Sequence, residues 1–287
     1  MTHPTASSPV TEHARNEYDR VTDPSIGYPA NHFALQQVLN VLQERRARRI
    51  LEVGIGNGNA IPVLAAAGLE VSGLEIKDDL VTASRQRLAE QGRPAEAVVW
   101  GDIEDATTYP SLRRSADFDA ILALGVLPHA RHERTVLTNM RALLQPGGTV
   151  FVECRNALFS LFTFNRYTSE FILDDLLGDA SPNVRKAVSD YLAPRLNMDL
   201  PPATASPATY HNPLEIPRVF REAGFTDIVI RPFHYHVAPP VLEHQLGQEF
   251  RDGSLALENE PSGWRGLFLC SAFLVQATRP RELDAGE

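Results

Sequence analysis

The chain has 287 residues, of which 43% are hydrophobic and 22% charged, and its formal net charge is −9 at pH 7. A chain of this length and apolar content can bury a full core, so one elaborated domain is expected rather than two equal ones. The negative charge would repel polyanions, so we expect no nucleic-acid partner.

Three features of the sequence concern its compartment and its relation to membranes. Residues 1–15 are polar and contain no apolar stretch that could act as a signal peptide, and no run elsewhere is long enough to span a membrane. Cys154 and Cys270, the two cysteines, are expected to be buried free thiols. We therefore expect a cytoplasmic protein without a membrane partner, with residues 1–15 and 281–287 as flexible ends.

A helical flank is expected over residues 16–48. Its helix covers about 32–48, because Leu35, Val38, Leu39 and Leu42 recur at the spacing of one buried helix face. The basic run from Arg45 to Arg49 is interpreted as the end of this helix, where positive charge is favourable.

The most informative segment follows the flank. Ile50–Val53 is an apolar run typical of a buried strand, and glycine then occupies positions 54, 56 and 58. Glycine allows backbone dihedrals closed to other residues and lets the backbone approach a ligand closely. A helix is predicted over 60–68, with Asn59 as its cap and Pro62 in its first turn. A strand, a glycine turn and a helix in this order form a ligand cradle.

A second predicted strand, residues 69–74, ends at Glu75. The distance from the glycines is close to the ~20 residues at which a ribose-binding acid follows such a turn. A carboxylate at this position can accept both ribose hydroxyls. The dinucleotide fingerprint would place its third glycine at position 59, where this chain has Asn59, which disfavours a nicotinamide cofactor.

Further strand and helix units continue the alternation. Residues 98–103, 118–125 and 149–153 are predicted as the third, fourth and fifth strands. Later, Asn212-Pro213 can start a helix that Gly224 stops. A sixth strand over 225–231 and a seventh over 266–277 complete the pattern.

The pattern Glu-x-Gly-x-Gly-x-Gly, with an acid closing the next strand, resembles motif I of the class I S-adenosylmethionine (SAM) dependent methyltransferases of the small-molecule type. The resemblance covers about residues 45–155 and 210–280. It implies an α/β, Rossmann-like, seven-stranded, mostly parallel sheet with an antiparallel last strand, helices on both faces and a helical lid insertion. Residues 49–153 would form the SAM-binding core and 212–280 the C-terminal part of the sheet. The cofactor would be SAM and the product S-adenosylhomocysteine.

The resemblance also implies the cofactor contacts. Glu52 would reach the methionine end, Glu75 the ribose, Asp102 the adenine amino group and Ile103 the adenine ring, while Tyr18 of the flank could cover the sulfonium. The expected cofactor residues are Glu52, Gly54, Gly56, Gly58, Glu75, Ile76, Asp102, Ile103, Leu124, Gly125 and Tyr18. The alternatives are structural: a tight turn of any nucleotide-binding fold, a carboxylate that only orients amides, and solvated acids.

Two additions to this minimal fold concern the acceptor. Residues 154–211 are far longer than a simple connection and are expected to form a lid, with an aromatic segment over 159–167 and helices over 171–177 and 182–192. The second addition joins the last two strands over 233–264. Because the last strand is expected to be antiparallel, both additions leave from the sheet edge where ligands of open α/β sheets bind.

The expected chemistry is in-line displacement of a methyl group, in which the protein holds the acceptor in place and excludes water. A hydroxyl acceptor also needs a base, and the catalytic candidates are His129 and Glu153. The substrate candidates are Arg155, Asn156, Tyr167, His211 and His234. Each could instead only cap or pack. We expect no metal, because His234 and His236 lack an acidic partner at ligand spacing.

The sequence therefore predicts a SAM-dependent methyltransferase for a small molecule, with O-methylation favoured and specialised metabolism as one setting. The alternatives are an N- or C-methyltransferase, a noncatalytic SAM-binding module and an NAD-dependent oxidoreductase. A homodimer is one option for the assembly.

Overall fold

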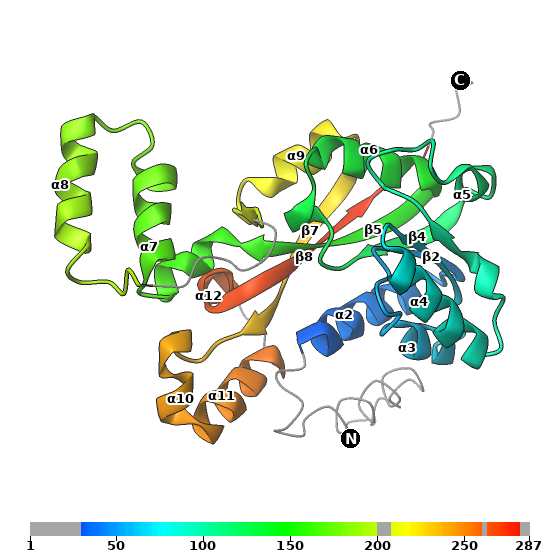
Figure 1. The fold of residues 1–287 in the computed structure, drawn as a ribbon, viewed down its shortest axis with the longest axis horizontal. Coiled ribbons are helices and arrows are strands. Elements are labelled where there is room, and N and C mark those ends of the chain that lie inside the picture. Colours follow the sequence, from blue (N-terminus) through cyan, green and yellow to red (C-terminus); the bar gives the residue numbers. More distant parts are fainter. Residues whose placement is uncertain (1–29, 200–207, 260–262, 282–287) are drawn as a thin grey trace, which may run out of the picture. The chain divides into compact units, whose positions relative to one another are not determined.

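The computed structural model describes residues 30–199, 208–259 and 263–281 (Figure 1). The chain divides into two compact units. Unit 1 contains the chain up to Glu153, Pro217–Arg231 and the chain from Leu274, whereas unit 2 contains Cys154–Ile216 and Pro232–Phe273. Both additions to the minimal fold thus belong to unit 2.

One eight-stranded sheet runs through the chain in the order β3-β2-β1-β4-β5-β8-β7, with β6 paired to β5. Its strands are β1 (Arg49–Val53), β2 (Glu70–Glu75), β3 (Val98–Trp100), β4 (Phe118–Ala123), β5 (Leu144–Asn156), β6 (Tyr210–His211), β7 (Thr226–Tyr235) and β8 (Cys270–Thr278). Strands β1 to β6 pair in parallel. The backbone of Arg279 donates to Gly148 and accepts from Gly147, so β8 runs antiparallel to β5. This confirms the predicted fold class, to which the short β6 adds an eighth strand.

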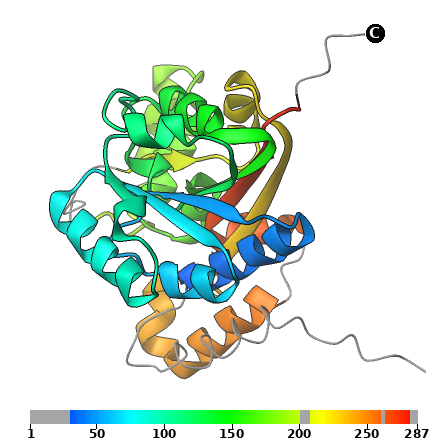
Figure 2. The ribbon, with the colours of Figure 1, turned by 90° about the vertical axis from the view of Figure 1, so that its right-hand side faces the viewer.

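The sheet part of unit 1 lies between two layers of helices (Figures 1 and 2). On one face lie α2 (Ala30–Glu44), α3 (Ile61–Ala66) and α4 (Asp78–Glu90), and on the other lie α5 (Pro110–Arg114), α6 (Glu133–Leu143) and α9 (Ile216–Glu222). The short helices η2 (Ala95–Ala97) and η3 (Leu127–His129) precede β3 and follow β4. Strands β1 and β4 are almost continuously buried, as expected for parallel strands covered on both faces.

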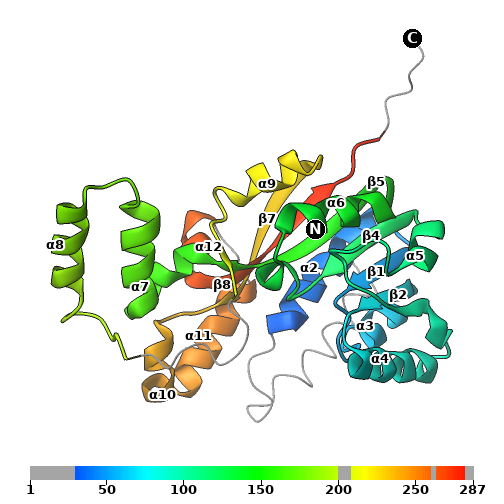
Figure 3. The same ribbon diagram turned by 45° about the horizontal axis from the view of Figure 1, so that its top comes forward.

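Unit 2 is mainly helical outside its strand ends. Its helices are η4 (Ala157–Phe162), α7 (Arg166–Glu170), the π-helix η5 (Phe171–Leu176), α8 (Pro182–Leu192), η6 (Pro240–Leu242), α10 (Glu243–Leu246), α11 (Gln248–Asn259) and α12 (Gly263–Leu269). Helices α7 and α8 lie side by side (Figures 1 and 3). The predicted start of α8 is confirmed, because the Ser181 side chain accepts a hydrogen bond from the Val184 amide.

The N-terminal helix ends earlier than predicted, at Glu44 rather than Arg48. Interpreting the basic run as a helix terminus was therefore wrong. Arg49 begins β1, and its guanidinium donates to the carbonyls of Ser115 and Asp117. Arg49 therefore does not end its own helix but binds carbonyls at and after the C-terminal end of α5 (Pro110–Arg114).

Two predicted helix starts were also displaced. Asn59 does not cap α3, whose cap residue is Ala60; the Asn59 side chain instead accepts a hydrogen bond from Arg87. Asn212 accepts from nearby amides in a turn, and α9 begins only at Ile216. Asparagine stabilises turns and helix caps by the same short side-chain bonds, so its presence alone does not fix the first helical residue.

The last two strands and one helix of unit 2 differ from their predicted limits. Residues 266–269 belong to helix α12, so the last strand starts at Cys270, and β7 continues to Tyr235 instead of ending at residue 231. The predicted helix over 171–177 is the π-helix Phe171–Leu176. Apolar runs of this length fit a buried helix and a buried strand equally well.

Both cysteines, Cys154 and Cys270, are buried and free, as predicted. Among the described residues, no helix has the length and apolar character needed to cross a membrane.

Candidate active site

The turn between β1 and α3 has the backbone conformation that its glycines predict. Gly54, Gly56 and Gly58 all have positive φ, at 68°, 55° and 70°. A Cβ atom at Gly54 would lie 2.5 Å from a methyl group of Val126, and one at Gly58 would lie 2.6 Å from Ile61. At Gly56 the nearest atom among the described residues would be the Gly54 carbonyl oxygen, at 4.0 Å. The outer glycines are thus required by the packing of the protein, and the middle one faces open space.

Glu75, at the end of β2, is fixed against this turn. One carboxylate oxygen accepts the Gly56 amide at 2.9 Å, and the other accepts the amides of Ile76 and Lys77 at 2.9 and 3.0 Å. The residue is only 5% exposed. A carboxylate has about four acceptor positions, so three internal bonds leave about one for a ligand hydroxyl.

Glu52 lies in β1, just before the turn, and is buried at 5% exposure. Its Oε2 atom has no hydrogen-bond partner among the described residues. Burial, together with the negative charge of Glu75, raises the pKa of Glu52 to about 8. A buried carboxyl oxygen without a partner is costly, so the site fits a ligand that brings a donor or a positive charge to this position.

The loop after β3 is held by its own side chains. Asp102 accepts the Glu104 amide at 2.8 Å and lies 3.4 Å from an Arg131 nitrogen. The carbonyl of Ile103 accepts a hydrogen bond from Asn139 of α6 at 2.7 Å. Ile76, after β2, is half exposed, and its carbonyl accepts the indole N–H of Trp100.

The loop after β4 contacts the glycine turn through the packing of Val126 on Gly54. Leu124 and Gly125 lie at the start of this loop, and Gly125 has a φ of 69°. His129 ends the short helix η3 and is exposed. Glu153 is half buried in β5, one residue beyond the pairing of Ala123 with Val152. His129 therefore follows the carboxyl end of β4, whereas Glu153 lies within the last residues of the adjacent parallel strand β5.

Comparison with known proteins gives the same interpretation as this geometry. Residues 51–150, which contain the glycine turn, Glu75 and Asp102, match the methyltransferase domain family. This part of the chain is a methyltransferase domain. The match sets aside an NAD-dependent oxidoreductase and confirms the expected cofactor, SAM.

Curated relatives of the methyltransferase domain share about a quarter of its residues. A ubiquinone biosynthesis O-methyltransferase of Azoarcus sp. (strain BH72) is 26% identical over 127 residues, which is 44% of this chain and 52% of the relative. The enzyme of the same name from Thiobacillus denitrificans is 26% identical over 177 residues, or 62% of this chain and 64% of the relative. The chain thus spans between half and two thirds of the length of these relatives.

Solved structures confirm the fold of the methyltransferase domain and its surroundings. A SAM-dependent methyltransferase from Mesorhizobium loti superposes with a TM-score of 0.51 and 15% identity, covering 86% of this chain and 98% of the other. At this identity the likeness concerns the fold.

SAM fits the residues of the glycine turn and of the two strands, β1 and β2, beside it. The open space at Gly56 allows close approach to the backbone, Glu75 retains an acceptor for a ribose hydroxyl, and Glu52 lacks the partner that the ammonium group of the methionine end would supply. Tyr18, the remaining expected cofactor residue, lies outside the described residues.

The substrate candidates all belong to unit 2, and they differ in how many internal partners they have. Asn156 is buried, and its amide donates to the carbonyls of Leu267 and Cys270 while its oxygen accepts the Leu158 amide. This amide therefore fastens the start of η4. Arg155 is exposed beside the buried Asn156.

Tyr167 and the histidines have mixed surroundings. The Tyr167 ring lies 5.8 Å from that of Tyr210, whereas His211 is buried in β6. His234 has a positive φ of 58°, and its ring lies 4.9 Å from that of His236. Burial lowers the pKa of His234 to about 4, so its imidazole is neutral and a weak base near pH 7. Within the parts that the structure describes, no three His, Cys, Asp or Glu residues group as metal ligands.

Three residues of unit 1 were not predicted from the sequence: Trp100, Glu104 and Arg131. Glu104 follows Asp102 by two residues, but a motif gives no hint of what its carboxylate contacts. Its partner at Arg131 comes 27 residues later in the chain, so only the folded loops bring the two together.

Proposed function

We propose that the chain transfers the methyl group of SAM to a hydroxyl group of a small, ring-bearing molecule. The observation that carries the proposal is the Oε2 atom of Glu52, which is buried and has no hydrogen-bond partner among the described residues, in the strand that leads into the glycine turn. The relatives named as O-methyltransferases support an oxygen acceptor.

When bound, SAM supplies an activated methyl group on its sulfonium. Glu52 would bind the methionine end and Glu75 the ribose. Asp102 and Ile103 would hold the adenine. His129 is the first candidate to take the proton from the acceptor hydroxyl, because imidazole suits proton transfer near neutral pH. Glu153 is the second.

For the acceptor we propose four residues of unit 2. Arg155 offers an exposed guanidinium that can bind an anionic group, and Tyr167 offers a ring beside that of Tyr210. His211 and His234 remain candidates for acceptor contacts. Asn156 is excluded from the proposal, because its amide is engaged by the protein itself.

The test is incubation with SAM carrying a radiolabelled methyl group and pairs of ring compounds that differ only in a hydroxyl or an amine. Label in the phenols and none in the matched anilines supports the proposal. Label in the amines, or on carbon, would establish the N- or C-methyltransferase alternative. Tight binding of S-adenosylhomocysteine without transfer to any compound of a metabolite extract would indicate a noncatalytic module.

The role of His129 is tested in the same assay with His129→Asn and Glu153→Gln. If one of these residues is the base of the transfer step, its substitution should lower kcat by about 10²-fold or more without changing the affinity for S-adenosylhomocysteine. A cytoplasmic setting and a homodimer also remain proposals; light scattering of the purified chain would determine the number of copies.

A further inference from the structure

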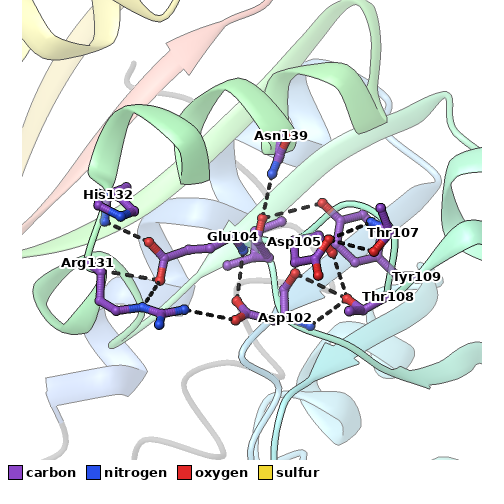
Figure 4. A network of polar contacts seen from close by, with 10 residues as sticks. Asp102, Glu104, Asp105, Thr107, Thr108, Tyr109, Arg131, His132 and Asn139 are labelled. Atoms are coloured by element: carbon purple, nitrogen blue, oxygen red, sulfur yellow. Dashed lines mark hydrogen bonds and ion pairs between the residues drawn. The ribbon is translucent and has the colours of Figure 1, made fainter.

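A polar network that includes Asp102 of the predicted site joins the loops that follow β3 and β4 (Figure 4). Its centre is Glu104, whose side chain is 12% exposed. One carboxylate oxygen accepts the backbone amide of His132 at 2.7 Å. The other accepts the backbone amide of Arg131 at 3.4 Å and its side-chain Nε at 3.2 Å. A single carboxylate thus binds two successive amides of the other loop.

The contacts of Glu104 differ in strength. The Arg131 side chain is 74% exposed, and an ion pair so open to water contributes little. The short bond from the His132 amide to a largely buried carboxylate is charge-assisted and is the stronger contact. Burial alone would raise the pKa of Glu104, but the bonds from Arg131 and His132 together hold it below its usual value.

The two loops also carry residues expected to contact the cofactor. The Glu104 amide binds Asp102, so its backbone orients the acid expected to meet the adenine amino group. Asn139 holds the carbonyl of Ile103 from α6. On the other side, His132 lies three residues beyond His129 and seven beyond Gly125. The position of Glu104 between these segments is therefore suited to align them.

We propose that Glu104 is a positioning residue for the adenine end of the SAM site: its carboxylate fixes the loop after β4 to the loop that presents Asp102 and Ile103. The inference rests on the proposed function, because it assigns a role within that site. The Arg131 guanidinium is dispensable to it, since the backbone amides of residues 131 and 132 stay in place when this side chain is removed.

Calorimetry with S-adenosylhomocysteine and with 5′-methylthioadenosine, which lacks the amino acid end, tests the proposal. Glu104→Ala should weaken the binding of both ligands by roughly tenfold, and Arg131→Ala by less than about threefold. Glu104→Gln should lie between them, because its amide oxygen can still accept the His132 N–H. Glu52→Gln is the control at the other end: it should weaken S-adenosylhomocysteine binding and leave that of 5′-methylthioadenosine unchanged.

The outcomes separate this inference from the proposed function. A wild-type chain that binds neither ligand would overturn both. Wild-type binding with equal affinity in Glu104→Ala would overturn only the role of Glu104, and so would an Arg131→Ala variant as weak as Glu104→Ala. If Glu104→Ala does not fold, the comparison of Glu104→Gln with Arg131→Ala decides. If Glu104→Gln then binds the two ligands no more weakly than Arg131→Ala does, the inference is refuted.

Discussion

Two buried polar residues, Glu52 of unit 1 and Asn156 of unit 2, differ in their partners. In unit 1, Glu52 keeps a buried carboxyl oxygen without a partner, and the glycine turn leaves free space at Gly56. In unit 2, Asn156 bonds to three groups of its own unit, and the carboxylate of Glu258 accepts the Tyr235 amide. Buried polar groups are normally paired, so an unpaired one signals a ligand more strongly than the residue type does.

The backbone of the glycine turn also differs from that of two residues in unit 2. In the turn, positive φ occurs at three glycines, where it costs little and opens the backbone to a ligand. Phe164 and His234 of unit 2 have positive φ as well, but there a side chain must be accommodated in a strained conformation. Substitutions in the turn are therefore expected to change binding, and substitutions at such residues of unit 2 to change stability.

The largest effect is expected from Gly56→Val, which should abolish detectable binding of S-adenosylhomocysteine. The new side chain would fill the space that the turn leaves for the cofactor. Gly92→Val is the matched control, because Gly92 has a similar φ of 68° and equally open surroundings at the end of α4. Both variants should lose stability to backbone strain, measured by urea unfolding. Calorimetry should show normal binding only for the Gly92 variant, and normal binding in both would place the cofactor elsewhere.

Glu52→Gln should stabilise the free protein and weaken its binding to S-adenosylhomocysteine. The pKa of Glu52 is raised to about 8, so the folded state keeps a proton that the unfolded chain loses above its ordinary pKa of 4.5. Glu52 therefore lowers stability progressively as the pH rises from 4.5 to 8, by about 3 kcal/mol at pH 7. Urea unfolding should show this gain in the variant at pH 7 and almost none at pH 4.5.

The exposed Glu70, at the start of β2, provides the control for Glu52. Glu70→Gln should change the free energy of unfolding by less than about 0.5 kcal/mol and leave cofactor affinity unaltered. In the wild type, binding of the cofactor ammonium should expel the Glu52 proton. Calorimetry in buffers of different ionisation enthalpy should then detect proton release at pH 7, and an absence of release would contradict the assigned partner of Glu52.

The fold of the segment from β1 to β2 was predictable because its signals are local. Strand, glycine turn and closing acid stand within 26 residues, from Ile50 to Glu75, and each has few other physical explanations. Contacts such as Glu104 with Arg131 depend on loops brought together by the sheet, which no local pattern encodes. In unit 2, residues 266–269 were assigned to a strand although they form α12, because a short apolar run suits either element once it is buried.

Asn156→Ala should cost about 2–3 kcal/mol of stability without changing the affinity for S-adenosylhomocysteine. The substitution leaves two buried carbonyls and one amide without their partner. Asn259→Ala, at the exposed end of α11, removes the same side chain where water can replace its bond, and should cost less than about 0.5 kcal/mol. Equal unfolding curves for the two variants would show that Asn156 is free for a substrate.

His234→Asn gives the smallest effect, and one confined to acid conditions. The pKa of His234 is lowered to about 4 by burial, so between pH 4 and the ordinary value of 6.5 the unfolded chain binds more protons than the folded one. His234 therefore does not reduce the free energy of unfolding above pH 6.5. As the pH falls towards 4 it lowers this free energy progressively, by about 2 kcal/mol at pH 5. Asparagine tolerates the positive φ, and its side chain does not titrate. Relative to wild type, the variant should gain this amount at pH 5 and nothing at pH 7.5 by urea unfolding, whereas His244→Asn, at an exposed site on α10, should not. A gain of equal size at both pH values would mean that the pKa of His234 is the same in the folded and unfolded chain, and would contradict its lowering by burial.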